Sequence, residues 1–339
     1  MPNQVTLKPS DHVFTVKTGE TILDAALREG FVISYGCRNG ACGTCKGRVL
    51  AGEVEHGACQ PNALSEAERR QGYALFCQAQ PRGDVVVECR EVGASKDVQI
   101  RTLPARVHRM QKLAPDIMLV ELKLPAAERL QFLAGQYIDL LPKEGGRRSF
   151  SMANAPHDDA VLQLHMRNYG GPFSTHVFTR MKERDILRFE GPLGTFYLRE
   201  NSEKPAILVA SGTGFAPVKA MLEHAFHAHC ARPLILYWGA RTRADLYMHD
   251  VAERWTREHN NFKYVPVLSE ALTTDHWRGR TGLVHQAVMK DIADMSGCQV
   301  YACGAPVMVD AARRDFVAQC GLPESEFYSD AFTPATPAG

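Results

Sequence analysis

Hydrophobic and polar positions follow three different rhythms along the chain. In the first part, residues 5–16 alternate apolar and polar side chains in two short runs around a polar turn, which predicts a β-hairpin. Apolar residues then recur at helical spacing and predict a helix over Thr21–Glu29, closed by Gly30. The run V-V-V-E-C at Val85–Cys89 predicts a further strand. Together these elements indicate a compact β-rich module.

The second rhythm, from Ile100 to about Glu200, contains strands only. Glycine and proline separate several short runs of alternating apolar residues, at 118–124, 136–141, 161–166 and 186–189. Short strands with this punctuation predict an antiparallel barrel.

The third rhythm begins after Pro205. A continuous apolar strand, A-I-L-V-A, leads into S-G-T-G-F-A-P and a helix. Further strands alternate with helical stretches, and we expect them at Leu234–Tyr237, Tyr264–Leu268 and Val300–Cys303. This alternation predicts a parallel α/β sheet. The sequence therefore predicts α+β and α/β architecture in three domains, over 1–92, 98–200 and 201–339, with the polar stretch Glu91–Asp97 as a linker.

Composition excludes several classes of function. The chain of 339 residues carries 39 Lys+Arg against 38 Asp+Glu, and a net charge of +1 predicts no general attraction to nucleic acid or to a membrane surface. No apolar run is long enough for a bilayer span, and the first residues do not begin a signal peptide. Ten cysteines are too sparse for a disulfide scaffold. We therefore expect a cytoplasmic protein with reduced thiols.

Four cysteines form the most informative pattern. Cys37, Cys42 and Cys45 fall in Y-G-C-R-N-G-A-C-G-T-C-K-G, and Cys77 follows after 31 intervening residues. The spacing C-x4-C-x2-C…C is typical of a plant-type 2Fe–2S cluster, and the glycines allow the loop to wrap tightly. Chance disulfides, buried free thiols and a zinc site are the alternatives. Zinc motifs usually pair two closely spaced cysteine knuckles, whereas Cys77 stands alone. The pattern predicts one-electron transfer.

Two runs in the barrel segment suit a pyrophosphate. An arginine at a strand end, in R-R-S-F-S at Arg147–Ser151, can bind a phosphate through two hydrogen bonds. The glycine pair of G-G-P-F-S-T, at Gly170–Thr175, offers backbone N–H groups at the start of a helix. Taken separately, each run also fits an ordinary solvated surface.

The loop S-G-T-G-F-A-P, at Ser211–Pro217, lies between a buried strand and a helix, where backbone N–H groups and the helix dipole favour a pyrophosphate. It is not the dinucleotide fingerprint, and a plain strand-to-helix turn is the alternative. The helix that follows ends in E-H-A-F-H-A-H-C, with His224, His227, His229 and Cys230. We interpret this cluster as a solvated helix face rather than a metal site.

The order of these motifs resembles a known superfamily. Residues 1 to about 92 resemble the β-grasp fold of plant-type ferredoxins. Arg148–Ser151 is similar to the R-x-Y-S flavin motif of the ferredoxin–NADP reductase superfamily, and Gly191–Gly194 matches its G-P-x-G turn. The resemblance implies that the protein binds FAD. Phe150 stands where the family usually has tyrosine, so the resemblance also implies that one hydrogen bond to the ribityl chain of FAD is absent. The implied FAD residues are Arg148 on a phosphate, Ser149, Phe150 against the ring or ribityl chain, Ser151 near N5, and Gly170, Gly171 and Ser174 on the pyrophosphate.

The same resemblance implies a Rossmann-like domain that binds a nicotinamide nucleotide. It assigns the nucleotide to Gly212, Thr213 and Gly214, and places Cys303 of the C-G-x-P motif, with Gly304, beside nicotinamide C4. It also makes Phe332, in Y-S-D-A-F, the aromatic residue that covers the flavin ring. The implied catalytic residues are Ser151, Cys303 and Phe332.

Cofactor preference depends on the end of the strand L-I-L-Y-W-G-A-R. A 2′-phosphate is usually bound by arginine, and a free ribose hydroxyl pair by a carboxylate. Arg241 and Arg243 lie close to Asp245 in the sequence, so both nucleotides stay open. The resemblance favours NADH, with Asp245 on the ribose.

The module order resembles the reductase components of phenol hydroxylase and soluble methane monooxygenase. In the cysteine loop and in the stretches Y-W-G-A-R and Y-S-D-A-F, the chain is similar to the CDP-6-deoxy-glucoseen reductases of deoxysugar biosynthesis. The resemblance implies an NADH-dependent oxidoreductase that passes electrons through FAD and a 2Fe–2S cluster to an acceptor protein, most simply a deoxysugar dehydrase. A di-iron or Rieske oxygenase component is the alternative acceptor. A redox sensor without turnover is the alternative of a different class.

Overall fold

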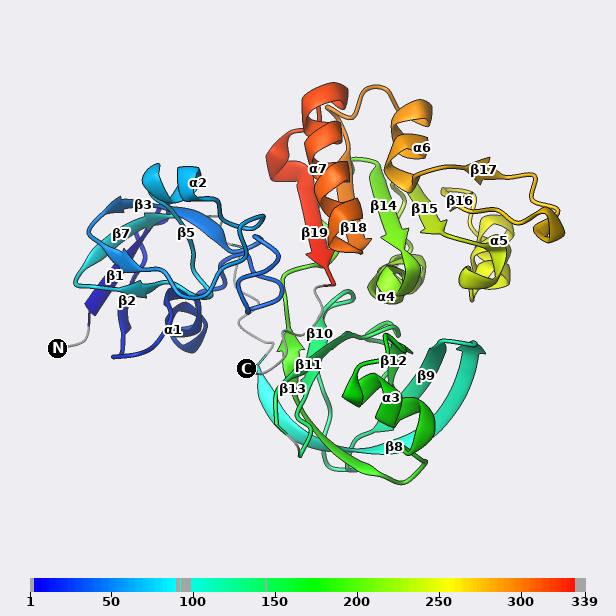
Figure 1. The fold of residues 1–339 in the computed structure, drawn as a ribbon, viewed down its shortest axis with the longest axis horizontal. Helices are drawn as coiled ribbons and strands as arrows, with labels where there is room; N and C mark the ends of the chain where they lie inside the picture. The colour runs from blue at the N-terminus through cyan, green and yellow to red at the C-terminus, as the bar shows by residue number, and fades with distance from the viewer. Residues whose placement is uncertain (1–2, 90–91, 93–98, 144, 333–339) are drawn as a thin grey trace. The chain divides into compact units, whose positions relative to one another are not determined.

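The structure, a computed structural model, describes residues 3–89, 92, 99–143 and 145–332. The chain divides into two compact units, Met1–Gln99 and Ile100–Gly339 (Figure 1). The predicted linker lies outside the described residues except for Val92. The predicted boundaries at residues 92, 98 and 200 stay predictions.

The first unit is built on a five-stranded sheet in the order β2-β1-β7-β3-β5. Strands β1 and β7 are parallel, and the other pairs are antiparallel, which is the β-grasp arrangement. The predicted hairpin, helix and closing strand are confirmed. The elements are β1 (Asn3–Lys8), β2 (Val13–Val16), α1 (Ile22–Arg28), β3 (Lys46–Ala51), β4 (Val54–Glu55), α2 (Glu66–Arg70), β5 (Tyr73–Leu75), β6 (Gln80–Pro81) and β7 (Val85–Glu88).

The barrel of the second unit is an antiparallel sheet in the order β11-β10-β13-β8-β9-β12. One bridge, between Met152 and Leu164, joins its two ends, so the sheet is nearly closed around an apolar core. The barrel predicted from the strand pattern is confirmed, but the segment does not contain strands only, because a helix at Pro172–Thr179 lies between two of them. Its elements are β8 (Arg101–Ala114), β9 (Ile117–Lys123), β10 (Tyr137–Leu140), β11 (Arg148–Ser151), β12 (Leu162–Arg167), α3 (Pro172–Thr179) and β13 (Ile186–Leu193).

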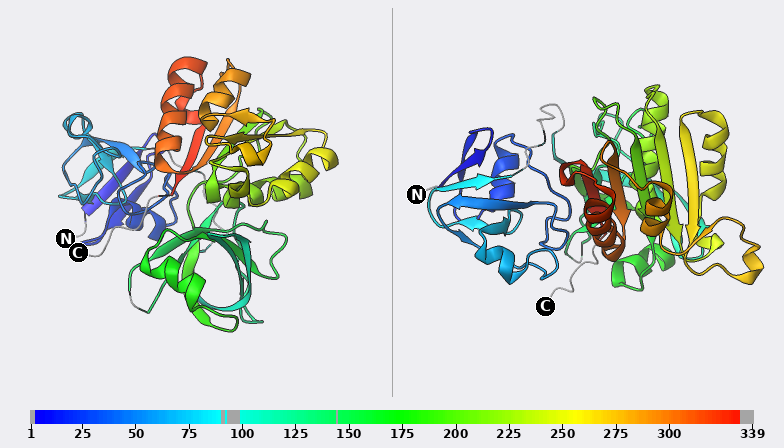
Figure 2. Two further views of the ribbon diagram at one scale, coloured as in Figure 1. Left: turned by 45° about the vertical axis from the view of Figure 1, so that its right-hand side comes forward. Right: turned by 90° about the horizontal axis from the view of Figure 1, so that it is seen from above.

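A parallel sheet in the order β17-β16-β15-β14-β18-β19 forms the rest of this unit, as the alternating pattern predicts. Helices α4 and α5 cover one face and α6 and α7 the other (Figure 2). Its elements are β14 (Ala206–Ser211), η1 (Gly212–Gly214), α4 (Phe215–His227), β15 (Leu234–Ala240), η2 (Arg243–Asp245), α5 (His249–Glu258), β16 (Phe262–Leu268), η3 (Thr273–Asp275), β17 (Arg280–Thr281), α6 (Val284–Asp291), β18 (Gln299–Gly304), α7 (Pro306–Cys320), η4 (Glu324–Glu326) and β19 (Phe327–Ala331).

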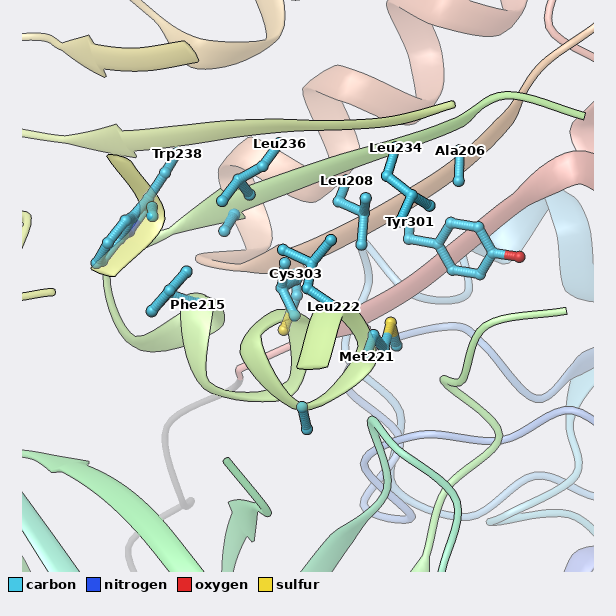
Figure 3. Packing of buried hydrophobic residues seen from close by; sticks show 14 of the residues in the cluster. Ala206, Leu208, Phe215, Met221, Leu222, Leu234, Leu236, Trp238, Tyr301 and Cys303 are labelled. Carbon is cyan, nitrogen blue, oxygen red and sulfur yellow. The ribbon is translucent and has the colours of Figure 1, made fainter. Parts of the chain in front are cut away.

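The central strand of the parallel sheet, β14, leads at its carboxyl end into Ser211–Pro217, here called the nucleotide loop. Its residues are buried because helices cover both faces, which explains the continuous apolar run in the sequence. Phe215, at the start of α4, stacks on Trp238 of β15 with ring centroids 3.9 Å apart (Figure 3). This packing fixes the helix that follows the loop. Within the described ranges, every helix is too short or too polar to cross a bilayer.

Candidate functional site

The four cysteines come from two loops of the first unit. Cys37, Cys42 and Cys45 lie between α1 and β3, and Cys77 lies between β5 and β6. They approach one another as two pairs: the Cys37 thiol hydrogen-bonds with Cys42, and the Cys45 thiol with Cys77. A two-iron cluster held by four thiolates takes two on each iron, and this pairing fits it.

Backbone conformation shapes the cysteine loop. Gly40 has φ +78°, and a Cβ there would lie 2.3 Å from the carbonyl oxygen of Ala58, so the position requires glycine. The side-chain amide of Gln78 donates to the carbonyl oxygen of Arg38 at 3.1 Å. This bond ties the segment that carries Cys77 to the loop that carries the other three cysteines.

Hydrogen bonds favour thiolate at part of this site. The Cys42 thiol, followed by the backbone amides of Asn39 and Ala41, lowers the pKa of Cys37 to about 7. The bond from Cys45 likewise lowers the pKa of Cys77. The same two contacts raise the pKa of Cys42 and Cys45. Thiolate is the form of cysteine that binds metal, so the backbone donors, such as those of Asn39 and Ala41, would remain with four bound thiolates.

Strand β11 presents the flavin motif. Arg147 is engaged in an ion pair, because its two terminal nitrogens donate to the Glu190 carboxylate at 2.8 and 3.1 Å. Arg148 instead donates to the carbonyl oxygen of Arg147 at 2.8 Å, which keeps its guanidinium at the start of the strand. The Ser149 hydroxyl donates to Asp139 at 2.6 Å and is already engaged.

Phe150 and the glycine pair come together at α3. The Phe150 ring lies against Phe173 of this helix, with centroids 6.0 Å apart. Gly170 has φ +77°, and Gly171 caps the helix without a side-chain hydrogen bond. The Ser174 hydroxyl donates back to the Gly171 carbonyl at 3.1 Å. The glycine pair thus opens α3 next to β11, and the binding of an FAD phosphate at this helix start stays a prediction.

The nucleotide loop lies directly against the C-G motif of β18. A Cβ on Gly214 would lie 2.2 Å from the Cys303 carbonyl oxygen, and a Cβ on Gly304 would lie 2.2 Å from the Ser211 Oγ. The Ser211 hydroxyl also accepts from the Ala305 backbone N–H at 3.0 Å. Only glycine permits so close an approach of two backbones, and the two predicted nucleotide motifs therefore form one surface.

Residues from β11, β18 and the end of β19 meet beside this surface. The Ser151 hydroxyl of β11 lies 3.5 Å from the Asp330 carboxylate of β19, and it is the donor. Burial, and then the Asp330 charge, raises the pKa of the Cys303 thiol, which is fully buried and therefore neutral. Phe332 follows, and its backbone N–H donates to the Gly304 carbonyl at 2.8 Å. The structure thus brings the three predicted catalytic residues into one neighbourhood.

Asp245 lies in η2, where its carboxylate is already engaged. It accepts hydrogen bonds from the Thr242 backbone N–H at 3.2 Å, from Arg241 at 3.4 Å and from Arg167 of β12 at 3.2 Å. These donors lower the pKa of Asp245 against the opposing effect of burial. A ribose hydroxyl would have to donate to the Asp245 carboxylate beside these three donors. The role of Asp245 in nucleotide binding therefore stays a prediction.

Two residues beside the predicted flavin and nucleotide sites could not be identified from the sequence. Asp330 is the buried acid that accepts from Ser151. Arg167 lies against the nucleotide loop, because a Cβ on Gly212 would lie 2.8 Å from one of its terminal nitrogens. A cation at this point suits a pyrophosphate. The only signal in the sequence is position: Asp330 lies two residues before Phe332, and Arg167 lies three before Gly170.

The histidine cluster forms a pair across two segments. The His227 ring stacks on His157 with centroids 3.8 Å apart, and His224 Nε2 lies 2.8 Å from the Glu200 carboxylate. Throughout the part of the chain that the structure describes, no three histidine, cysteine, aspartate or glutamate side chains converge as a site for a single metal ion.

Comparisons with known families cover all three domains. Residues 5–82 match the model of a 2Fe-2S iron-sulfur cluster binding domain, residues 104–197 that of an oxidoreductase FAD-binding domain, and residues 208–314 that of an oxidoreductase NAD-binding domain. The cofactors expected from the sequence, a 2Fe–2S cluster, FAD and a nicotinamide nucleotide, agree with these matches.

Individual relatives resemble the chain over its full length. A CDP-6-deoxy-L-threo-D-glycero-4-hexulose-3-dehydrase reductase of Yersinia pestis is 40% identical over 99% of this chain and 100% of its own length. The phenol hydroxylase P5 protein of Acinetobacter pittii is 34% identical over 99% of this chain and 96% of its own length. The crystal structure of the Amycolatopsis reductase GcoB superposes with a TM-score of 0.82 at 35% identity, over 98% of this chain and 100% of that one. The chain therefore belongs to the family of iron–sulfur flavoprotein reductases that combine a 2Fe–2S domain with FAD- and NAD-binding domains.

Proposed function

We propose that this chain oxidises NADH in the cytoplasm and delivers the electrons singly to a deoxyhexulose dehydrase. FAD, when bound, supplies the step between two-electron and one-electron chemistry, which a nicotinamide and an iron–sulfur cluster cannot make directly. The observation that carries the proposal is the meeting of Ser151, Cys303 and Asp330 beside the nucleotide loop.

The residues of the site would hold and orient the reactants. Arg148 and the start of α3 would bind the FAD phosphates, and Phe150 would lie against the ring or ribityl chain. Asp330 would keep the Ser151 hydroxyl in one orientation at the reacting edge of the flavin. Cys303 would pack beside the nicotinamide as a neutral thiol, because its raised pKa removes it as a nucleophile.

The four cysteines would hold the 2Fe–2S cluster as the exit for electrons. Cys37 with Cys42, and Cys45 with Cys77, would each bind one iron. The 40% identity with the dehydrase reductase over the full length of both chains supports a dehydrase as acceptor. The phenol hydroxylase relative supports an oxygenase component as the second candidate.

Anaerobic stopped-flow mixing with NADH tests the proposal. We expect flavin and cluster absorbance to bleach in sequence at rates that support turnover, and NADPH to react more slowly. A redox sensor would show no turnover with any acceptor. Adding either the purified dehydrase or a phenol hydroxylase oxygenase component, and following NADH consumption coupled to product, distinguishes the two acceptors.

A further inference from the structure

A barrel strand is buried on both faces where the nucleotide domain covers it. Leu162, Leu164 and Met166 of β12 belong to the barrel core, so alternation places His165 and Arg167 on the outer face. His165 is nevertheless only 5% exposed. The covering side chains come from the nucleotide domain, and they make polar contacts with this outer face.

A continuous series of contacts runs from this strand to the nucleotide loop. His165 Nδ1 lies 2.9 Å from the Tyr247 hydroxyl oxygen. The Tyr247 ring packs edge-on against Trp238, with centroids 5.2 Å apart at 88°. The Trp238 indole N–H then donates to the Gly212 carbonyl oxygen at 3.1 Å. Phe215 stacks on the face of the Trp238 ring in the core (Figure 3), and it also contacts Tyr247 edge-on, with centroids 6.1 Å apart.

The members of this series are unsuited to proton transfer. Burial, with a smaller effect of the Lys219 charge, lowers the pKa of His165 to about 3. Burial also raises the pKa of Tyr247 far above its ordinary value. Both side chains are therefore neutral at physiological pH, and the bond between them holds the two domains without a charge.

We propose that His165, Tyr247 and Trp238 are positioning residues that set the distance between the nucleotide loop and the flavin-binding barrel. The inference rests on the proposed hydride transfer from NADH. The barrel would hold one reactant and the loop the other, and hydride transfer requires the reacting atoms to approach within about 3–3.5 Å. A misplacement of about 1 Å can lower the rate of such a step by about a hundredfold.

Tyr247→Phe removes the hydroxyl and leaves the ring in place. Tyr264→Phe is a matched control, because the Tyr264 hydroxyl lies 3.1 Å from Nδ1 of His249 in the same domain, outside this series. In anaerobic stopped-flow experiments, Tyr247→Phe should lower the limiting rate of flavin reduction by NADH by about tenfold or more. The dissociation constant of NADH should change by less than about threefold, because the nucleotide contacts remain. The control should react as the wild type does.

Two further conservative variants distinguish the loss of a specific hydrogen bond from misfolding. Trp238→Phe removes the N–H to Gly212 while it keeps an aromatic ring in the stack. His165→Asn keeps a neutral polar atom near the position of Nδ1, so it should retain most of the rate that His165→Leu loses. Wild-type rates in Tyr247→Phe, Trp238→Phe and His165→Leu would overturn the positioning role alone. A wild-type protein that fails to reduce flavin with NADH would instead overturn the proposed function.

Discussion

Cys77 is the predicted cluster ligand that lies outside the glycine-rich loop. Cys77→Ser should abolish the cluster and keep FAD, because the two cofactors depend on separate units of the chain. Visible absorbance and iron content, measured beside the flavin content, check this result. Cys59→Ser is the control in the same domain, and it should keep the cluster.

A substitute ligand would complicate that experiment. The charge of Cys77 acts on Cys59, which therefore lies near the site. The double variant, with both cysteines changed to serine, removes this route. A full cluster spectrum in the double variant would show that Cys77 is not a ligand.

Phe332 ends the described part of the chain beside the Gly304 carbonyl. If its ring covers the flavin, the nicotinamide must displace it, at a cost of about 0.5–1.5 kcal/mol of aromatic packing. Phe332→Ala should then strengthen nicotinamide binding and narrow the preference for NADH over NADPH. Titration of both oxidised nucleotides, followed by charge-transfer absorbance, measures both effects. Unchanged affinities would exclude a covering role.

The lowered pKa of buried His165 predicts that the stability of the folded protein depends on pH. The folded protein keeps it neutral down to a pKa of about 3, against an ordinary value of 6.5, so the unfolded chain binds the proton first as pH falls. The contribution of neutral His165 to the free energy of unfolding is complete above pH 6.5. It is lost as the pH falls toward 3, by up to about 1.4 kcal/mol per pH unit. The midpoint of thermal FAD release should fall less steeply with pH in His165→Asn.

At the scale of elements, the close approach of the nucleotide loop and β18 requires glycine on both sides, at Gly214 and Gly304. Gly214 has φ −57°, so alanine is allowed by conformation, but its Cβ would lie 2.2 Å from the Cys303 carbonyl. Gly214→Ala should push the loop away, weaken NAD⁺ binding by about tenfold or more, and destabilise the fold by about 1–3 kcal/mol. Isothermal titration and thermal melting measure the two effects.

Gly297 supplies the comparison for that substitution. A Cβ there would meet nothing within 4 Å, and its φ is ordinary. Gly297→Ala should leave nucleotide affinity unchanged. Equal affinities in the two variants would show that the loop tolerates displacement and that its tight packing has no role in binding.

Periodicity predicted the elements well, because the buried face of a strand or helix appears as a repeating apolar pattern within its own residues. The runs at 161–166 and 300–303, for example, correspond to β12 and β18. Side-chain partners were not predictable in this way. Asp330 meets a serine 179 residues away, and His165 meets a tyrosine 82 residues away. Such contacts depend on the packing of the two domains, which no local pattern records.

At the scale of the whole molecule, the division into Met1–Gln99 and Ile100–Gly339 separates the predicted cluster from the flavin and nucleotide sites. A chain that begins at Lys96 should therefore still reduce ferricyanide with NADH. It should fail with cytochrome c, because one-electron protein acceptors would need the cluster domain as their donor. Steady-state assays with the two acceptors measure the difference. Undiminished cytochrome c reduction would mean that electrons leave directly from the flavin.

Strand β19 is translated after all the other strands of the described chain, so the predicted catalytic site is completed late in synthesis. During translation the first unit emerges and can fold before the remainder exists, since domains generally fold as units from the N-terminus. Ser151 leaves the ribosome 179 residues before Asp330, its partner in the site. A growing chain therefore presents all four cysteines of the first unit before the Ser151–Asp330 contact can form. Under the proposed function, the site of hydride transfer is completed last.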